Sequence, residues 1–355
     1  MSMVNKFFKV AVYIFAIIGF VLVAGFFAVK FKLTNTSGIV DSQNEYFLRA
    51  AEESESIAYC RFMAIKKLLP ENAQSIAAIY SQTKSKKVLD RMILTVFLQY
   101  KDDKNFSGSI STCLGGKNPV TLEEAVNSIQ PSTSPAAIAF PWSKGEEWRV
   151  LGQAIRNDEK ALNKAAADAG VDPRLIISNL IVEQLRLYYS NREIFKSVFS
   201  PLKLLGNQSQ FSWGVMGIKQ ETAEKIEDNL KDKQSPFYPG PQFEHILDFK
   251  TSDHGQERFE RLTNEKDHYY SYLYAALYMR EVTSQWKNAG HDISDRPEIV
   301  STLYNIGFDR SKPTADPKVG GAAINISGRV YSFGSLAHEF YYSGELAELF
   351  PYRNL

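Results

Sequence analysis

One glutamate shares a predicted helix face with large aliphatic side chains. At helical spacing, Ile176, Leu180 and Leu187 form a stripe that also contains Glu183. Burial there would disfavour the charged carboxylate and raise its pKa above the reference value of about 4.3, which suits a general acid working near neutral pH. The alternative is a structural glutamate that forms a salt bridge with Arg186 or another arginine.

Two further segments carry groups that suit a binding cleft. Residues 211–223 read FSWGVMGIKQETA, a glycine-rich turn that leads into an amphipathic helix at about 221–230. Glycines let the backbone approach a ligand closely, and exposed backbone groups there can hydrogen-bond a polar substrate. Residues 294–308 read SDRPEIVSTLYNIGF and place Tyr304 and Asn305 at the end of a predicted helix. Taken singly, the two segments are equally well explained as a turn and a helix cap.

Taken together and in this order, the three segments resemble the lysozyme-like catalytic domain of the lytic transglycosylases and goose-type lysozymes. That family shows a glutamate late in a hydrophobic helix, then a G-L-M-Q-I type turn, then an A-Y-N-x-G helix end. The counterparts are Glu183, Gly214–Ile218 (GVMGI) and Tyr304–Gly307 (YNIG). The resemblance covers about residues 147–310, under half of the chain.

The chain departs from the family pattern at three places. Gln184 stands where serine commonly follows the glutamate, and Gly217 stands where the turn has glutamine. The segment Tyr188–Gln210 is longer than usual between the two motifs, which indicates inserted structure near the cleft. Because Gly217 has no side chain, a substrate contact of the family is missing here.

The resemblance implies cleavage of the β-1,4 bond between N-acetylmuramic acid and N-acetylglucosamine in peptidoglycan. Glu183 would protonate the leaving oxygen, and the muramyl C6 hydroxyl would attack its own anomeric carbon to give a 1,6-anhydro end. One carboxylate suffices for this route, whereas an inverting hydrolase needs a second one to activate water. Glu193 and Glu221 are candidates for that second role, but no spacing selects either. Transglycosylation is therefore preferred over hydrolysis.

The resemblance also implies which residues bind the glycan strand, with no cofactor. The expected substrate-binding residues are Ser212, Gly214, Met216, Tyr304 and Asn305. The five histidines show no paired spacing that binds a metal, so no metal is expected, and no phosphate-binding or dinucleotide-binding glycine motif is present. The formal net charge of +1 gives no global basic field for nucleic acid.

The N-terminal region contains a long apolar run. Residues 10–29 read VAVYIFAIIGFVLVAGFFAV and carry no charge, and at about 1.5 Å per residue they span a hydrocarbon layer of roughly 30 Å. The run is longer than a signal-peptide core and lacks its cleavage pattern, so an uncleaved single-pass anchor is expected. Two lysines flank it on each side, so charge does not set the orientation. The substrate does: residues 1–9 are expected in the cytoplasm of a bacterium, and the catalytic domain on the periplasmic or extracytoplasmic side of the inner or cytoplasmic membrane.

The remaining sequence predicts a mainly α protein in several parts. A helical spacer or partner-binding region is expected at 33–130, where residues 42–130 offer a surface for an envelope protein. A proline-rich linker at 131–145 precedes the lysozyme-like domain at 146–310. A C-terminal extension at 311–355, irregular or a short β-hairpin, is expected to pack on that domain.

The two cysteines and two rival functions stay open at this point. Cys60 and Cys113 form either one disulfide, if their region faces an oxidising compartment, or two buried thiols. One rival is a non-catalytic lysozyme-like protein that binds glycan or scaffolds an envelope machine, which the Gln184 and Gly217 departures favour. The other is an α-helical, membrane-tethered interaction protein in which the motif order is accidental.

Overall fold

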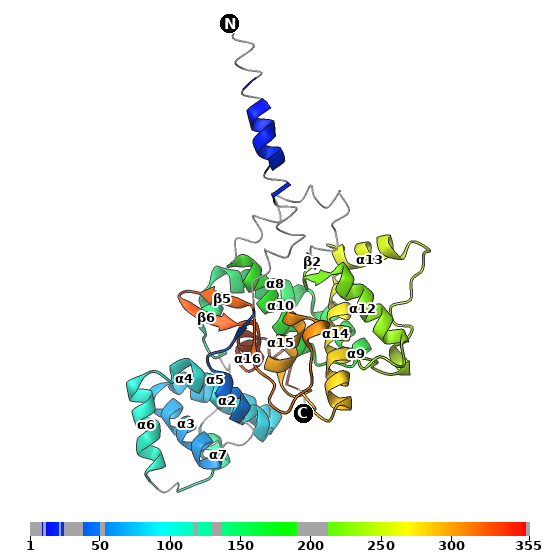
Figure 1. The fold of residues 1–355 in the computed structure, drawn as a ribbon. Coiled ribbons are helices and arrows are strands. Elements are labelled where there is room, and N and C mark those ends of the chain that lie inside the picture. Colours follow the sequence, from blue (N-terminus) through cyan, green and yellow to red (C-terminus); the bar gives the residue numbers. More distant parts are fainter. Residues whose placement is uncertain are drawn as a thin grey trace.

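Helices make up most of the chain, as the sequence predicts (Figure 1). The computed structural model describes residues 9, 12–20, 23–24, 38–49, 54–116, 119–129, 137–189 and 212–352. Its α-helices after residue 38 are α2 (Asn44–Arg49), α3 (Glu55–Leu68), α4 (Pro70–Thr83), α5 (Lys86–Tyr100), α6 (Lys104–Leu114), α7 (Leu122–Asn127), α8 (Glu146–Asn157), α9 (Glu159–Ala169), α10 (Pro173–Tyr188), α12 (Gln220–Lys231), α13 (His254–Thr263), α14 (Tyr269–Asn288), α15 (Pro297–Ile306) and α16 (Phe333–Tyr341). Short 3-10 helices are η1 (Pro141–Lys144), η4 (Pro241–Phe243) and η5 (Phe308–Arg310).

The strands of the described residues are short and form three antiparallel pairs. They are β1 (Ile39–Val40) with β4 (Gly320–Gly321), β2 (Ser212–Trp213) with β3 (Ile218–Lys219), and β5 (Ala323–Ile326) with β6 (Arg329–Ser332). The β5–β6 pair is a short β-hairpin, one of the two forms expected for the C-terminal extension. The two-residue β2–β3 ladder was not expected, because two residues are too few to show a period-two pattern.

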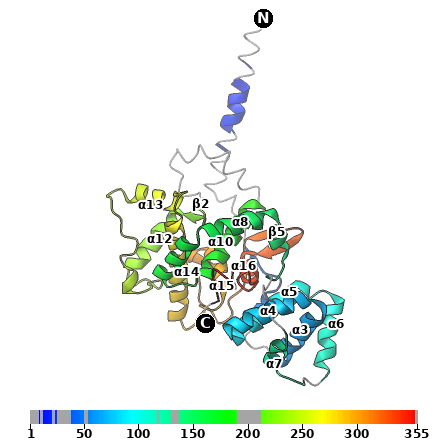
Figure 2. The same ribbon diagram turned by 180° about the vertical axis from the view of Figure 1, so that it is seen from behind.

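The N-terminal helices α3 to α7 form one end of the molecule, and α12 and α13 lie at the other end in both views (Figures 1 and 2). Pro70 is the first residue of α4, as its fixed backbone angle favours. A disulfide joins Cys60 of α3 to Cys113 of α6. This pairing decides between the two alternatives that the sequence left open.

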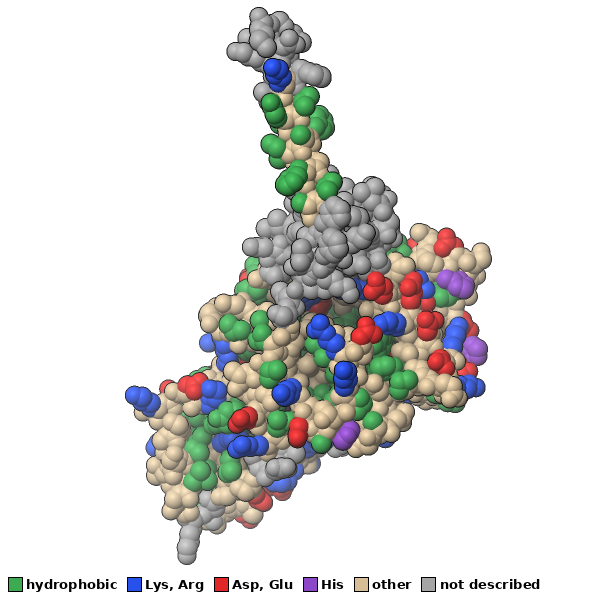
Figure 3. All heavy atoms as spheres, in the orientation of Figure 1, with side chains coloured by type: hydrophobic (Ala, Val, Ile, Leu, Met, Phe, Trp, Pro, Cys, Tyr) green, Lys and Arg blue, Asp and Glu red, His purple; other side chains and the backbone are tan. Residues whose placement is uncertain are grey.

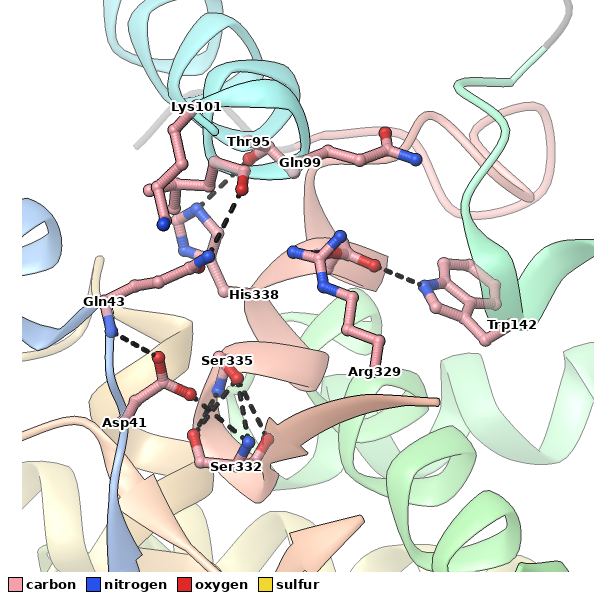
Figure 4. Close-up of polar contacts among 12 residues, drawn as sticks. Asp41, Gln43, Thr95, Gln99, Lys101, Trp142, Arg329, Ser332, Ser335 and His338 are labelled. Carbon is pink, nitrogen blue, oxygen red and sulfur yellow. Dashed lines mark hydrogen bonds and ion pairs between the residues drawn. The ribbon is translucent and has the colours of Figure 1, made fainter. Parts of the chain in front are cut away.

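Buried polar contacts tie this N-terminal end to the C-terminal residues (Figure 4). The Asp41 carboxylate accepts a hydrogen bond from the Ser332 backbone N–H at 3.2 Å. The hydroxyl of Thr95, in α5, lies 3.1 Å from Nε2 of His338, in α16, and Nδ1 of that imidazole lies 3.2 Å from the Glu298 carboxylate of α15. Buried apolar side chains from Phe47 to Tyr352 form one connected cluster, so the predicted spacer and extension share a core with the predicted domain.

The C-terminal extension contains more than the expected irregular or hairpin tail, because it also forms α16. Every residue of this helix is buried, and the helix packs against α10 and α15. Ser332 caps its start by accepting a hydrogen bond from the Ser335 N–H at 3.1 Å. Two of its buried residues, His338 and Glu339, are ionisable, so residue type alone does not indicate that the helix is buried.

Part of the predicted linker is packed rather than exposed. Ile138, Phe140 and Trp142 are at most 1% exposed, and the Trp142 indole N–H donates to the Glu339 carboxylate at 3.0 Å (Figure 4). The prolines that suggested a linker are compatible with this packing, because Pro141 begins η1. Residues 131–136 lie outside the described residues.

The apolar N-terminal run is described only in part. Of residues 10–29, the structure describes 12–20, 23 and 24; residues 12–20 are helical and expose apolar side chains (Figure 3). Within the described residues, no helix combines the length and apolarity needed to cross a membrane. Of the predicted insertion after Tyr188, residues 190–211 lie outside the described part.

Candidate functional site

Helix α10 carries Glu183 and is fixed firmly at its start. The Asp172 carboxylate caps it by accepting a hydrogen bond from the Arg174 N–H at 2.8 Å, and Pro173 is the first helical residue. The buried Arg174 guanidinium donates to the carbonyls of Tyr341 at 2.8 Å and Phe350 at 3.0 Å. The C-terminal extension therefore sets where α10 lies, and with it the position of Glu183.

Glu183 is buried yet lines a cleft. It is 4% exposed, and Arg186, one turn later in α10, binds its carboxylate with two donors. Arg186 Nε lies 3.1 Å from Oε2, and Nη2 contacts Oε1. Glu183 therefore forms the salt bridge with Arg186 that the sequence offered as the alternative to a catalytic role. The same glutamate also lines the cleft.

The glycine turn packs directly against this carboxyl group. Gly217 has φ of +65°, and a Cβ added to it would lie 2.8 Å from Cδ and 3.0 Å from Cγ of Glu183. Gly214 also has φ of +65°, and its added Cβ would lie 2.8 Å from the Ser271 hydroxyl and still closer to the Leu262 carbonyl. The two residues that depart from the family pattern, Gly217 and Gln184, thus each have a local role. Gly217 leaves room for the Glu183 carboxyl group, and Gln184 Nε2 donates to the Val215 carbonyl at 2.5 Å and fixes the turn.

Tyr304 connects the third segment to the turn. Its hydroxyl donates to the Met216 carbonyl at 2.7 Å. Burial, followed by the nearby charge of Glu183, raises the pKa of Tyr304 well above its usual value, so the phenol keeps its proton and remains a donor. The neighbouring Asn305 uses its carbonyl oxygen to accept from the Ala322 N–H at 2.8 Å.

These three segments meet in one cleft with a volume of about 340 Å³. Its acidic side chains are Glu183, Glu221 and Asp309, and its cationic side chains are Arg186, Lys219, Lys225 and Arg310. Lys and Arg side chains lie over the middle of the face that Figure 3 shows. The lining is mainly polar, which suits a ligand rich in hydroxyl, amide or carboxylate groups.

Only some of the predicted site residues line the cleft. Glu183, Tyr304 and Asn305 line the cleft together. The Met216 side chain is fully buried, so it does not line the cleft as expected and contributes its carbonyl oxygen instead. Gly214 lines a second, more apolar hollow of about 790 Å³ on α8, α10 and α13. Ser212 lies in β2, and its side chain is outside the described atoms.

Several cleft residues were not predicted. Arg186 was considered only as a structural partner, although its position three residues after Glu183 places both on one helix face. Lys219, Lys225 and Arg310 lie next to the predicted motifs but belong to no pattern. Gly38 and Ala322 come from outside the predicted domain and reach the cleft only through the β1–β4 side of the fold.

The chain matches no protein-family model, no curated protein and no solved structure, so the chemistry of the cleft rests on its own geometry.

Proposed function

We propose that this chain is a membrane-anchored peptidoglycan lytic transglycosylase of lysozyme-like fold. It would cleave the β-1,4 bond between N-acetylmuramic acid and N-acetylglucosamine and leave a 1,6-anhydro end. The observation that carries the proposal is that Glu183, the Gly214–Ile218 turn and Tyr304 meet at one cleft. They come from three separate segments, and an accidental order of motifs gives no reason for them to meet.

The proposed chemistry needs one residue that both gives and takes a proton. Glu183, as the carboxylic acid, protonates the oxygen that leaves with N-acetylglucosamine as the glycosidic bond breaks. The muramyl C6 hydroxyl then bonds to the anomeric carbon and gives its proton back to Glu183. The acid is regenerated, and no water is consumed.

The other carboxylates in the cleft define the hydrolytic alternative. Asp309 is paired with Lys225 at 2.7 Å, which leaves Glu221, in the first turn of α12, as the better candidate for activating a water molecule. Glu193, the other candidate from the sequence, lies outside the described residues.

Two features support an extracytoplasmic cleft. The Cys60–Cys113 disulfide suits an oxidising compartment, since cytosolic thiols are kept reduced. The uncharged run at residues 10–29 has the length of a membrane anchor. An anchor with residues 1–9 in the cytoplasm would place the cleft beside the wall, and the helices in 42–130 would remain available to an envelope partner.

A non-catalytic, glycan-binding protein is the second candidate, and one observation favours it. Arg186 binds Glu183 with two donors, so the carboxylate that would have to act as the acid is held in an ion pair. In this case the cleft would hold glycan strands without cleaving them.

Mass spectrometry of the products tests the proposal. The full-length chain, purified in a mild detergent, is incubated with purified peptidoglycan beside Glu183→Gln, which keeps the size of the side chain. We expect 1,6-anhydro ends from the wild type and at least about a 100-fold loss in the variant, the lower range for removal of a general acid and base.

Other products would change the conclusion. Reducing ends would indicate hydrolysis, and Glu221→Gln should then abolish them. Glycan binding by both wild type and Glu183→Gln, with no product from either, would contradict the enzyme and favour the non-catalytic candidate.

A further inference from the structure

Arg186 and Glu183 form a largely dehydrated ion pair within the cleft. Their side chains are 12% and 5% exposed, and both donors of the guanidinium fork face the carboxylate. A bidentate guanidinium is among the strongest partners of a carboxylate. Since a general acid must carry a proton, this pair has to open before Glu183 can act.

The charge of the cleft changes when Glu183 takes up a proton. Four cationic and three acidic side chains line it, so protonation of Glu183 leaves four cations facing two acids. An anionic ligand would then restore the balance, and Arg186 is the cation that Glu183 has just released. Binding of an anion and protonation of Glu183 therefore favour each other.

We propose that a carboxylate of the substrate displaces Glu183 from Arg186, so that substrate binding itself protonates the acid. The guanidinium exchanges one carboxylate for another, and Glu183 takes one proton from water. Arg186 is then a specificity-determining residue for glycan strands with a free carboxylate near the scissile bond. This inference rests on the proposed function, and it names the form of the substrate.

Two carboxylates of peptidoglycan have the required chemistry. One is the lactyl carboxylate, which is free where the peptide has been removed from the muramyl residue. The other is a free carboxylate of the peptide itself. Both would be recognised by the same fork, because a guanidinium binds any accessible carboxylate with two parallel donors.

The test compares matched strands and matched variants of the full-length chain in detergent. The strands are peptide-free glycan with free lactyl carboxylates, the same glycan with each carboxylate blocked as a methylamide, and intact peptidoglycan. The variants are Arg186→Gln and, as the control, Arg49→Gln, the same change at an exposed arginine of α2 that does not line the cleft. Thermal melting shows that each variant is folded.

We expect the wild type to prefer the free carboxylate over the methylamide by roughly tenfold or more in kcat/KM, as a charge-assisted hydrogen bond provides. Arg186→Gln should reduce this preference to within about twofold, because glutamine offers no charged fork to the substrate carboxylate. Arg49→Gln should retain the preference. Equal cleavage of peptide-free and intact strands would point to a peptide carboxylate as well as the lactyl one.

An unchanged preference in a folded Arg186→Gln variant would overturn the inference and leave the proposed function standing. If the wild type cleaves nothing, the proposed function fails. The inference about Arg186 is then tested by the affinity for glycan strands alone. If one proton is taken up as each strand binds, the affinity for free-carboxylate strands should fall as pH rises in the wild type but not in Glu183→Gln. A parallel fall in both proteins would overturn it.

Discussion

The α-carbon of Gly217 lies against the Glu183 carboxyl group, in a backbone conformation with φ of +65°. Most residues avoid this left-handed region, which costs a non-glycine residue about 1 kcal/mol or more. The close contact adds a steric reason, because any side chain at 217 would occupy space that Glu183 fills. The glutamine of the family pattern is thus incompatible with this position of the carboxyl group.

Gly217→Ala should therefore lower the rate of cleavage strongly, while the protein remains folded. The added methyl group displaces the Glu183 carboxyl, and misplacing a reacting group by about 1 Å can cost roughly 100-fold in rate. We expect product formation to fall by at least about tenfold while the protein still melts cooperatively. Both are measured on the full-length chain, by product analysis and by thermal unfolding.

Gly290→Ala is the matched control, because Gly290 has φ of +84° and no atom within 4 Å of an added Cβ. This variant should lose only the backbone contribution to stability, about 1 kcal/mol, with unchanged cleavage. Equal activity of Gly217→Ala and Gly290→Ala would contradict the assignment of Glu183 as the reacting acid.

At the level of single residues, the sequence was informative where a residue type implies a role by itself. Glu183 on an apolar stripe and Tyr304 before a helix-ending glycine both reach the cleft. The side chain of Met216 does not, because the tight turn directs its backbone carbonyl, rather than its thioether, toward Tyr304. Side-chain direction within a turn depends on backbone angles that residue types alone do not specify.

Helix α14 carries a carboxyl group, that of Glu281, in the buried core. Three of its tyrosines, Tyr272, Tyr274 and Tyr278, are buried in the core. Glu281 of the same helix is fully buried; one oxygen accepts from Asn229 at 3.0 Å, and the other has no hydrogen-bond partner among the described residues. Burial raises the pKa of Glu281 well above its usual value of 4.5, so the folded protein holds this group as the neutral acid.

Glu281→Gln should make the protein more stable at high pH and not at pH 4. The folded-state pKa of Glu281 is raised, so its proton stabilises the fold fully below the unfolded pKa and less as pH rises towards the folded value. Glutamine has no such proton to lose. The stability difference between variant and wild type should grow above about pH 4.5 by up to about 1.4 kcal/mol per pH unit, measured by urea unfolding from pH 4 to pH 9.

Glu339 gives this prediction an internal comparison. Burial raises its pKa to about 7, so the gain from Glu339→Gln should stop growing near that pH. A stability difference for Glu281→Gln that stays constant over the whole range would show that Glu281 is ionised in the folded protein.

The helix boundaries were predictable where a local signal sets them. Capping residues and residues with restricted backbone angles mark these ends. Helix α10 begins at Asp172 and Pro173, α4 begins at Pro70, and α15 ends at Gly307. Helix α16 and the short helix η1 also begin at such signals, Ser332 and Pro141, but no local signal marks them as buried. Their burial results from contacts with distant segments, such as Trp142 with Glu339, which local patterns do not report.

Across the whole molecule, the N-terminal helices and the site-bearing helices share one core, so the compartment that contains one contains the other. The disulfide closes a separation of 53 residues at the end formed by α3 to α7. By the chain-entropy argument, such a loop stabilises the fold by about 4 kcal/mol. A chain that folds in a reducing compartment would lack this contribution, so under the proposed function the orientation of an anchor at residues 10–29 would affect stability as well as access to peptidoglycan.

Thiol labelling in bacteria tests this orientation. Cells are dissolved directly in denaturant that contains a light maleimide, which blocks every free thiol, including the buried Cys60, and the chain is then reduced and treated with a heavier maleimide. If residues 10–29 deliver the chain to the oxidising side, Cys60 and Cys113 take up the heavy reagent only after reduction, as two labels per chain. The matched variant that lacks residues 10–29 stays in the cytoplasm, where its thiols are blocked in the first step and take up none. Blocking of both thiols in the full-length chain would place the cleft on the cytoplasmic side, away from peptidoglycan, and would contradict both the anchor orientation and the proposed substrate.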